Sequence, residues 1–389
     1  MPDTELQKII ELLESDDKTN VLLALELAQN CQNEFENNYQ NSLEDYKIVL
    51  EWVWEYLPDV ENPLMLDGLE IQGKKLTYIP SQIKILKKLR CLLLNYNALR
   101  VIPAEIAQLK NLEYLYLGAN SFTEFPIEVC QCQNLVSLVL GGNLFDTISP
   151  QIKQLVQLES FKLHNGKLKT LPPEIGELQN LKSLHLENNQ LTALPPAIGE
   201  LRNLKSLHLE NNQLTALPPA IGKLKLLHTL NLEKNQLQTL PTQIGELEFL
   251  ETLDLAKNQL INLPKEIGKL KKVRRIDAIK NQLTTLPATL SEMSELCYLW
   301  LRENKISHLP TQIGELKNLE YFNLSNNLLE TLPKEIGQIS SLKSLSLENN
   351  PLQVLPDTLL DIPNVKIHVA GNPDLKVSDK LRSSGKLIF

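Results

Sequence analysis

The sequence predicts an α/β solenoid, a stack of short strand-and-turn units with a helical N-terminal cap. Three observations favour this fold. The pattern LxxLxLxxN returns with a period of 23 residues, a proline follows with the same period, and the first 62 residues differ in charge from the rest. Of the 389 residues, 42% are hydrophobic but only 5% are aromatic, so we expect an aliphatic core.

The asparagine of this pattern recurs at intervals of 23 residues or a multiple of 23. It stands at Asn97, Asn120, Asn143, Asn189, Asn212, Asn235, Asn258, Asn281, Asn304, Asn327 and Asn350. The series is interrupted at Gly166, where Asn165 comes one place early. Running the register outward puts Lys74 in the first asparagine position and Asn372 in the last. We count fourteen units between about residues 64 and 373.

A proline after an aliphatic or aromatic residue keeps the same period. It stands at Pro80, Pro103, Pro126, Pro172, Pro195, Pro218, Pro241, Pro264, Pro287, Pro310, Pro333 and Pro356. Ser149 interrupts this series. Residues 171–193 and 194–216 differ at two positions only, which indicates a tandem duplication. Twelve successive units without insertion or deletion indicate a repeat array.

Each landmark has a physical reason. The LxL segment predicts a short strand whose leucines point to one side. One unit cannot bury this apolar side alone, so neighbouring units stack their strands into a parallel sheet over a continuous leucine core. The asparagine amide can donate to and accept from buried backbone groups as a ladder. Proline presets φ where a short helical or 3₁₀ return segment begins. Because that segment is wider than the spacing between strands, the stack is expected to curve with its strands on the inside.

The motif LPxxIGxLxxLxxLxLxxNxL closely resembles the leucine-rich repeat family over about four fifths of the chain. It is similar to the 23-residue repeats of plant intracellular Ras-group-related proteins, of animal Ras-pathway scaffolds and of bacterial leucine-rich repeat proteins. The resemblance implies a right-handed horseshoe with a concave parallel sheet, and a role in protein–protein recognition. The cysteine-rich flanking caps of extracellular members are missing, and Lys74 and Gly166 depart from the asparagine ladder.

The ends of the array need cover, because bare terminal repeats expose core leucines. We expect an acidic helical cap over residues 1–62, the solenoid over 63–373 and a C-terminal cap or tail over 374–389. Residues 1–62 contain 15 acidic and 3 basic side chains. Apolar residues at helical spacing predict about three helices there, with Asp16 or Asp17 capping the second. The Asn- and Gln-rich stretch 29–41 predicts a loop.

The register places two side chains per strand on the concave face, between the leucines. Although aromatic residues are scarce, Tyr298, Trp300 and Tyr321 occupy these positions together, and arginines flank them. Tyrosine, tryptophan and arginine are the residue types enriched in interface hot spots. A second, more apolar group surrounds Tyr114 and Tyr116. The alternative is that exposed aromatics simply stack on their strand neighbours. The predicted partner-binding residues are Tyr114, Tyr116, Arg275, Asp277, Tyr298, Trp300, Arg302, Tyr321 and Asn323.

His185 and His208 occupy equivalent positions on adjacent predicted strands, so their side chains could share a zinc ion. Duplication alone also explains the pair, because the two units are near copies, and no cysteine joins it. We predict no metal and no cofactor. A metal- or small-ligand receptor using the histidines stays the alternative function, together with end-to-end self-assembly into a structural protein.

Other function classes lack their signatures. The phosphate loop GxxxxGK[ST] and the motifs GxSxG and HExxH are all missing, so we predict no enzyme activity. A net charge of −8 argues against general nucleic-acid binding. No apolar run reaches membrane length and no leader is recognisable, and five scattered cysteines argue against a disulfide framework. We therefore expect a cytoplasmic, monomeric, non-enzymatic module or scaffold, typical of signal transduction, that binds a protein partner on its concave face.

Overall fold

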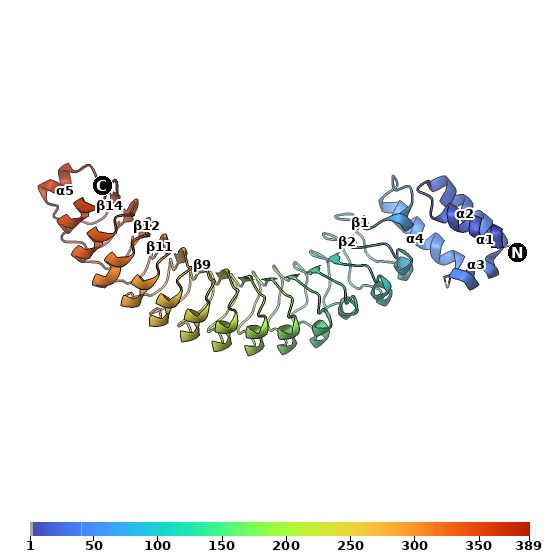
Figure 1. The fold of residues 1–389 in the computed structure, drawn as a ribbon, viewed down its shortest axis with the longest axis horizontal. Helices are drawn as coiled ribbons and strands as arrows, with labels where there is room; N and C mark the ends of the chain where they lie inside the picture. Colours follow the sequence, from blue (N-terminus) through green and yellow to red (C-terminus); the bar gives the residue numbers. More distant parts are fainter. Residues whose placement is uncertain (1–2, 40) are drawn as a thin grey trace. The chain divides into compact units, whose positions relative to one another are not determined.

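The computed structural model describes residues 3–39 and 41–389 (Figure 1). The chain divides into two compact units, 1–167 and 168–389. Both units are built from the predicted strand-and-turn repeat, and the first also contains the N-terminal helices. This confirms the predicted α/β solenoid with a helical N-terminal cap. The predicted domain limits at residues 62 and 373 stay predictions. The division after Lys167 separates two compact parts of the repeat array, and it does not separate the repeats from the helices or from the tail.

The first unit begins with helices α1 (Asp3–Leu13), α2 (Lys18–Asn30), α3 (Gln32–Tyr39) and α4 (Leu43–Tyr56). Asp17 caps α2 by accepting from the Thr19 N–H at 2.7 Å, which confirms one of the two predicted caps. The expectation of a loop over 29–41 was wrong for the residues that the structure describes, because α3 occupies most of that stretch. Phe35 is the reason: its ring is buried and meets Tyr46 edge to face at 5.6 Å.

Five parallel strands follow in the first unit, each paired in register with the next. They are β1 (Gly68–Glu70), β2 (Cys91–Leu93), β3 (Tyr114–Tyr116), β4 (Ser137–Val139) and β5 (Ser160–Lys162). Between them the chain returns through single 3₁₀ turns of five residues each, which are η2 (Ser81–Ile85), η3 (Ala104–Gln108), η4 (Ile127–Gln131) and η5 (Pro150–Gln154). A preceding proline with φ near −70°, or Ser149, begins each turn, as the period of the prolines predicts.

The second unit continues the same pattern with ten strands paired in chain order. They are β6 (Ser183–His185), β7 (Ser206–His208), β8 (Thr229–Asn231), β9 (Thr252–Asp254), β10 (Arg275–Asp277), β11 (Tyr298–Trp300), β12 (Tyr321–Asn323), β13 (Ser344–Ser346), β14 (Lys366–His368) and β15 (Leu387–Ile388). Within this unit the strands line the inner side of the bend and the 3₁₀ turns η6 to η14 the outer side (Figure 1).

The C-terminal tail covers the last repeat more fully than the sequence suggests. Helix α5 (Asp379–Ser383) buries Leu381 completely, and β15 adds a strand to β14. The Lys386 ammonium donates to the carbonyl oxygens of Leu359 and Leu360 at 3.3 and 2.7 Å and to that of Ile362. These bonds fix the tail over carbonyls at the end of the turn η14 (Asp357–Asp361).

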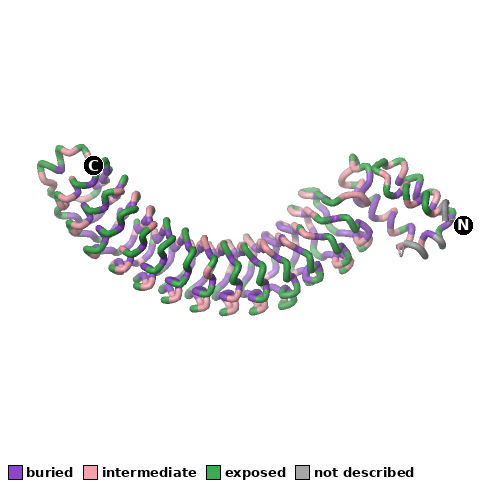
Figure 2. The backbone as a smooth tube through the Cα atoms, in the orientation of Figure 1, coloured by how far each residue is buried: buried purple, intermediate pink, exposed green. Residues whose placement is uncertain are grey.

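In the repeats of each unit, buried residues lie between the strands and the 3₁₀ turns (Figure 2). Most of these buried residues are aliphatic. The leucine at the centre of β9, Leu253, and those of the same repeat on either side, Leu250 and Leu255, are all fully buried. The predicted asparagine ladder runs beside this strip. Asn258 accepts from the Leu237 N–H at 3.0 Å and donates to the Leu232 and Leu255 carbonyls at 2.9 and 3.0 Å.

Candidate functional site

Strand residues on either side of each buried leucine project from the strand face, so adjacent strands place their side chains in two rows. In the second unit, one row carries Thr252, Arg275, Tyr298, Tyr321 and Ser344 from β9 to β13. The other row carries Asp254, Asp277, Trp300, Asn323 and Ser346. Parallel pairing in register therefore brings together six of the nine residues predicted from sequence, those on β10 to β12.

The aromatic cluster, which is Tyr298, Trp300 and Tyr321, is held by ring contacts. Tyr298 and Tyr321 stack in parallel with ring centres 5.1 Å apart, and Tyr298 meets Trp300 edge to face at 6.1 Å. Both tyrosines keep more than a third of their surface exposed, and Trp300 is half-buried. The stacking expected of strand neighbours is thus present, and it leaves apolar ring surface open to a partner.

Arg275 covers one face of this cluster. Its guanidinium carbon lies 4.3 Å from the centre of the Trp300 ring, which is cation–π geometry. The same guanidinium lies 3.7 Å from the Asp277 carboxylate, and its Nε–H is buried with no hydrogen-bond partner among the described residues. Arg302 instead pairs with Glu303 at 2.9 Å. Arg275 therefore belongs to the cluster, whereas Arg302 is directed to a neighbouring acid.

Acidic and amide side chains of the second row have a structural role that the sequence did not reveal. Asp254 and Asp277 each accept from the N–H two residues on, at 3.0 and 3.1 Å, and Asn231 and Asn323 do the same at 3.0 Å. Such bonds satisfy the backbone as the chain leaves a strand. One side-chain oxygen of Asp277 and of Asn323 is thus used in a bond to the backbone. The second carboxylate oxygen of Asp254 and of Asp277 takes no part in this bond.

A hollow of about 360 Å³ lies beside the aromatic cluster, over the ends of β8 to β11. It is lined by both signs of charge, from Glu233, Asp254, Lys257, Arg275, Asp277, Lys280, Arg302 and Glu303. Lys257 pairs with Glu233 at 2.7 Å and Lys280 with Glu303 at 3.3 Å. The members of these two ion pairs were not predicted from sequence, because they lie beyond the strand ends. Their fixed offset within each repeat was the available signal.

Asp254 is the lining carboxylate without an ion pair in the part of the chain that is described. Burial raises its pKa to about 6, and the charges of Asp277 and Glu233 push in the same direction against the bond from Ala256 N–H. Burial also raises the pKa of Asp277, while Arg275 opposes that rise. A half-buried carboxylate without a cation costs folding free energy when it is ionised.

We predict that Asp254→Asn stabilises the chain at pH 7, by about 1 kcal/mol because water screens a half-exposed carboxylate. The folded pKa of about 6 lies above the ordinary value of 3.8. The stability contributed by this group is therefore present below about pH 4 and is lost as the pH rises through 6. Asparagine keeps the bond from Ala256 N–H, as Asn231 shows on the next strand. Urea unfolding at pH 4.5 and 7 measures both effects.

The reverse change is the matched control. Asn231→Asp places a carboxylate at the equivalent position on β8, so it should lower the free energy of unfolding at pH 7 and recover part of it at pH 4.5. If Asp254→Asn is less stable than the parent at pH 7, Asp254 is stabilised by its surroundings and the assignment of an unpaired, desolvated carboxylate is wrong.

The remaining two predicted residues, Tyr114 and Tyr116 on β3, lie in the first unit. Tyr114 is 37% exposed and Tyr116 is half-buried, with Val139 of β4 beside Tyr116 in the register. Tyr96, exposed by 70%, lines a second hollow of about 230 Å³ together with Val139. Tyr114 and Tyr116 are surface residues as predicted, but they are not held in stacked pairs like those of the aromatic cluster.

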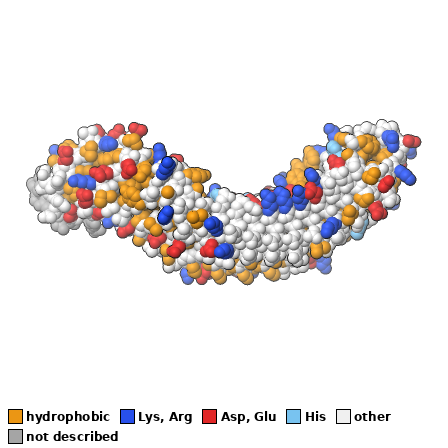
Figure 3. Space-filling view, turned by 180° about the vertical axis from the view of Figure 1, so that it is seen from behind, with side chains coloured by type: hydrophobic (Ala, Val, Ile, Leu, Met, Phe, Trp, Pro, Cys, Tyr) orange, Lys and Arg blue, Asp and Glu red, His pale blue; other side chains and the backbone are white. Residues whose placement is uncertain are grey.

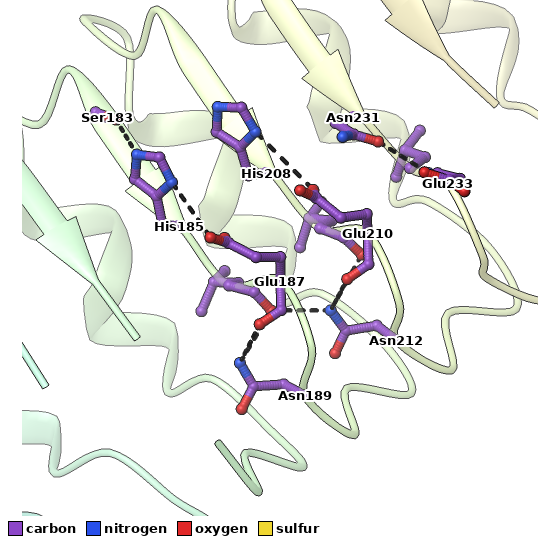
Figure 4. A network of polar contacts seen from close by, with 12 residues as sticks. Ser183, His185, Glu187, Asn189, His208, Glu210, Asn212, Asn231 and Glu233 are labelled. Atoms are coloured by element: carbon purple, nitrogen blue, oxygen red, sulfur yellow. Dashed lines mark hydrogen bonds and ion pairs between the residues drawn. The ribbon is translucent and has the colours of Figure 1, made fainter. Parts of the chain in front are cut away.

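His185 and His208 form a polar network on β6 and β7 (Figure 4). Their rings stack in parallel with centres 4.6 Å apart, and each Nδ1 faces a glutamate two residues on, at 3.6 Å to Glu187 and 3.9 Å to Glu210. Burial, and then the neighbouring His185, lower the pKa of His208. Among the side chains that the structure describes, no three of His, Cys, Asp or Glu are grouped to hold a metal.

No disulfide joins the five cysteines, all of which the structure describes. Burial raises the pKa of Cys91 and Cys297, and raises those of Cys130 and Cys132 to about 12. A thiol with a raised pKa is a poor nucleophile, because the thiolate is the reactive form. The cysteines near the strand face therefore have no activated character.

The repeat, the asparagine ladder and the strand face define a solenoid of 23-residue units, and comparison with known proteins names its family. The family model described as leucine-rich repeat region matches residues 143–235 and 219–297, and that described as leucine rich repeat matches 294–352. A leucine-rich repeat protein of Leptospira interrogans is 38% identical, with a TM-score of 0.75 over 83% of this chain and 84% of that chain. The chain belongs to the leucine-rich repeat family.

Two further solved structures are similar in fold. The plant peptide hormone receptor RGFR1 in complex with RGF2 is 25% identical, with a TM-score of 0.56 over 81% of this chain and 63% of that chain. The Toll–Spatzle complex of Drosophila is 22% identical, with a TM-score of 0.70 over 82% and 44%. Comparison with curated protein sequences finds no match. The leucine-rich repeat fold generally serves as a surface for protein–protein interaction. The described helices include none with the length and apolarity needed to cross a membrane.

Proposed function

We propose that this chain is a non-enzymatic binding module or scaffold that holds a protein partner on the strand face of its second unit. The observation that carries the proposal is the aromatic cluster. In a chain with 5% aromatic residues, Tyr298, Trp300 and Tyr321 meet on two adjacent strands with ring surface exposed. Tyrosine, tryptophan and arginine dominate interface hot spots, and Arg275 completes that composition here.

The geometry supports a pre-formed anchor. The stacked tyrosines and the Arg275–Trp300 contact restrict the rotamers of all four side chains before binding. These side chains would therefore lose little conformational entropy when a partner binds. The adjacent hollow offers charged groups of both signs for the polar rim that surrounds such anchors. The other predicted contacts of the second unit, Asp277, Arg302 and Asn323, contribute to binding in this proposal as secondary positions. Tyr114 and Tyr116 stay a separate proposed contact surface of the first unit.

The kind of partner follows from the family. The plant peptide hormone receptor RGFR1 is solved in complex with RGF2, and a protein or peptide partner is the counterpart proposed here. We further propose that the chain acts as a monomer in the cytoplasm, in a signalling scaffold. Five free thiols support a reducing compartment. Sedimentation across a wide concentration range tests the monomer, with a mass that grows with concentration favouring self-assembly instead.

Trp300→Ala should weaken partner binding by about 2 kcal/mol, or roughly 30-fold in Kd, because it removes the largest ring of the cluster and the contact with Arg275. The partner is first captured with the parent chain and identified by comparison with a triple variant, Tyr298→Ala, Trp300→Ala and Tyr321→Ala. Calorimetric titration then measures the affinity of the purified partner for the parent chain and each single variant.

A matched control substitutes Thr229, Thr252 and Ser344 by alanine, which changes three positions of the same strand face outside the cluster. The control should keep the affinity of the parent. Equal capture of the same proteins by the parent and the aromatic triple variant, with both folded by circular dichroism, would remove the cluster from the binding site.

A further inference from the structure

The first-unit hollow is the hollow of about 230 Å³ beside Tyr96 and Val139, over the ends of β3 and β4. Its floor is backbone, because Gly118 and Gly141 line it and both are buried. Three repeats of the second unit carry a long side chain at the position of these glycines, at Glu187, Glu210 and Glu233. In Figure 3, hydrophobic side chains on the N-terminal half gather in patches with lysine and arginine side chains beside them. The strand face of the first unit is therefore open at a position where later repeats carry glutamates.

Tyr96 forms an exposed wall of the first-unit hollow and has a strained backbone. Its φ is +60°, in the left-handed region that a bulky side chain rarely adopts. The equivalent position is asparagine in five other repeats, with φ between 54° and 58°, at Asn165, Asn188, Asn211, Asn326 and Asn349. The Tyr96 side chain is 70% exposed and its ring stacks on no other ring among the described residues. Neither packing nor backbone preference accounts for a tyrosine here, and strained residues cluster at functional sites.

Lys162 gives the first-unit hollow its charge. It is half-buried on β5, next to Val139 in the register, and has no ion pair in the part of the chain that is described. None of the lining residues is acidic, and the other ionisable one is His164, whose ring packs beside Gly141. The acid of the same row, Glu70, stands at the opposite end of the row on β1. The hollow therefore complements a negative group.

A backbone donor in the first-unit hollow adds to this preference. In the repeats of β9 and β10, the N–H two residues beyond the strand donates to Asp254 and Asp277, which project from the strand face. The equivalent N–H after β4 belongs to Gly141, and the Val139 side chain offers it no acceptor. The Gly141 N–H has no acceptor elsewhere among the described residues. It is therefore available to a carboxylate, and such a charge-assisted hydrogen bond is stronger than a neutral one.

We propose that the first-unit hollow binds a segment of a protein partner in which an aromatic side chain stands next to an aspartate or glutamate. The aromatic side chain packs on Tyr96 and Val139 over the glycine floor, and the carboxylate pairs with Lys162 and accepts from the Gly141 N–H. A volume of about 230 Å³ is below the ~300–1,000 Å³ of sites that hold whole small molecules, so the hollow takes one side chain of a partner. The inference rests on the proposed function in that the occupant is a protein, but it involves no residue of the aromatic cluster.

The first probe is a phage-displayed library of random linear peptides, selected on the full chain. Peptides in which Phe, Tyr or Trp stands next to Asp or Glu should be enriched on the parent chain. The double variant Tyr96→Asn with Lys162→Gln should lose this enrichment, and the aromatic triple variant of the second unit should keep it. Enrichment of neutral or basic peptides only, no enrichment, or equal enrichment on the double variant would overturn the proposal.

The most enriched peptide, fluorescently labelled, then measures the ion pair by anisotropy titration. Lys162→Gln should weaken its binding about tenfold and reduce the dependence of binding on salt, because one charge pair is lost. The same peptide with its acid replaced by the amide should bind the parent chain about as weakly. It should lose little more on Lys162→Gln, because both changes remove one interaction. Fully additive losses would mean that the carboxylate does not meet Lys162, which sinks the proposal.

Tyr96→Asn separates binding from folding. It should weaken the peptide at least about fivefold and leave the Tm unchanged or higher, because asparagine already occupies the equivalent left-handed position in other repeats. Tyr78→Asn makes the same change in the same unit on a tyrosine that is 51% exposed outside the hollow, and Lys153→Gln removes an exposed charge on η5. Both controls should bind like the parent chain. Unchanged affinity for Tyr96→Asn would contradict the proposal.

The aromatic triple variant distinguishes failure of this inference from failure of the proposed function. It should bind the labelled peptide normally, whatever its effect on capture of a partner by the second unit. Loss of peptide binding in that variant would place the peptide on the second unit and remove the first-unit hollow as its site.

Discussion

Asn258→Ala is expected to cost the second unit about 3 kcal/mol of unfolding free energy, the largest single-residue loss among the variants considered. Asn258 is 7% exposed and its side chain bonds four backbone groups. It accepts from Leu237 N–H and donates to the carbonyls of Leu232, Leu255 and Ala256. Alanine leaves the buried Leu237 N–H without its acceptor, which costs about 1–3 kcal/mol. It also removes one of the two donors to each of the three carbonyls, which keep their bonds from Asn235, Asn281 and the Lys234 N–H.

The ladder explains why the loss spreads beyond one repeat. The amide of Asn258 joins the strand exits of β8 and β9, and Asn281 repeats the bond one repeat further on, to Leu255. In a linear array, stability is the sum of each repeat and its interfaces with its neighbours, so one weak interface lowers cooperativity. Hydrogen exchange should therefore quicken first in peptides around Leu237 and then in those on either side.

Asn318→Ala is the matched control for this prediction. It makes the same substitution in the same unit, but its side chain forms a single exposed bond to the Ser294 carbonyl at 2.7 Å. Its cost should stay below about 1 kcal/mol. Equal urea midpoints for the two variants would mean that the ladder bonds add no net stability.

Periodicity is what made most of the fold predictable. Because strand, asparagine and proline recur together every 23 residues, one register assigns fourteen of the fifteen described strands. The predicted positions of Tyr114 and Tyr116, and of Tyr298 and Trp300, coincide with strands of the structure. A single repeat carries little information, but an error of register would have moved every leucine out of the core. The strand positions of Tyr298, Trp300 and Tyr321 follow from the same rule.

The N-terminal helices lack such repetition, so errors fall there. In α3 (Gln32–Tyr39) polar residues dominate, and Phe35 supplies the burial that holds the helix. Four helices are described in place of the predicted three, and the capping box of Ser42 and Asp45 at the start of α4 was a missed signal. Short helices with one or two buried residues depend on tertiary contacts that spacing alone does not show.

Pair contacts within the site were also beyond the sequence. Register placed Arg275 one strand before Tyr298, yet the guanidinium reaches diagonally to Trp300, which depends on rotamers. The same limit applies to Arg302, which the sequence placed with the cluster and the structure pairs with Glu303. Sequence therefore predicts which side chains share a face, and side-chain packing decides which of them act together.

The division after Lys167 has a counterpart in two departures from the repeat. The asparagine position is glycine at Gly166, so that rung of the ladder has no amide. In most repeats of the second unit, the position equivalent to Gly176 is also a glycine. In the first unit the same position carries larger residues, at Lys84, Ala107, Cys130 and Lys153. A missing rung and a change in the outer turns at nearly the same residue give a physical reason for the boundary.

Gly268→Ala tests the importance of that glycine position and should destabilise the second unit by about 2 kcal/mol, with a lower Tm. A Cβ at Gly268 would lie 2.0 Å from the Thr289 carbonyl oxygen in the next 3₁₀ turn. That atom is backbone, so relief requires the turns η10 (Lys265–Lys269) and η11 (Ala288–Glu292) to move apart. The distance between these two turns sets how closely neighbouring repeats pack on their outer side. Moving the turns apart therefore also strains the asparagine ladder that joins the same repeats.

Ser291 gives the internal control, since it occupies the equivalent position in the next repeat and already carries a Cβ. Ser291→Ala removes only a hydroxyl that donates to Glu315 at 3.0 Å on the surface, so its Tm should stay close to that of the parent. The comparison separates steric spacing from helix propensity, because alanine favours helical turns over both glycine and serine. If Gly268→Ala instead raises the Tm, propensity outweighs the close approach, and the glycines do not set the spacing of the outer turns.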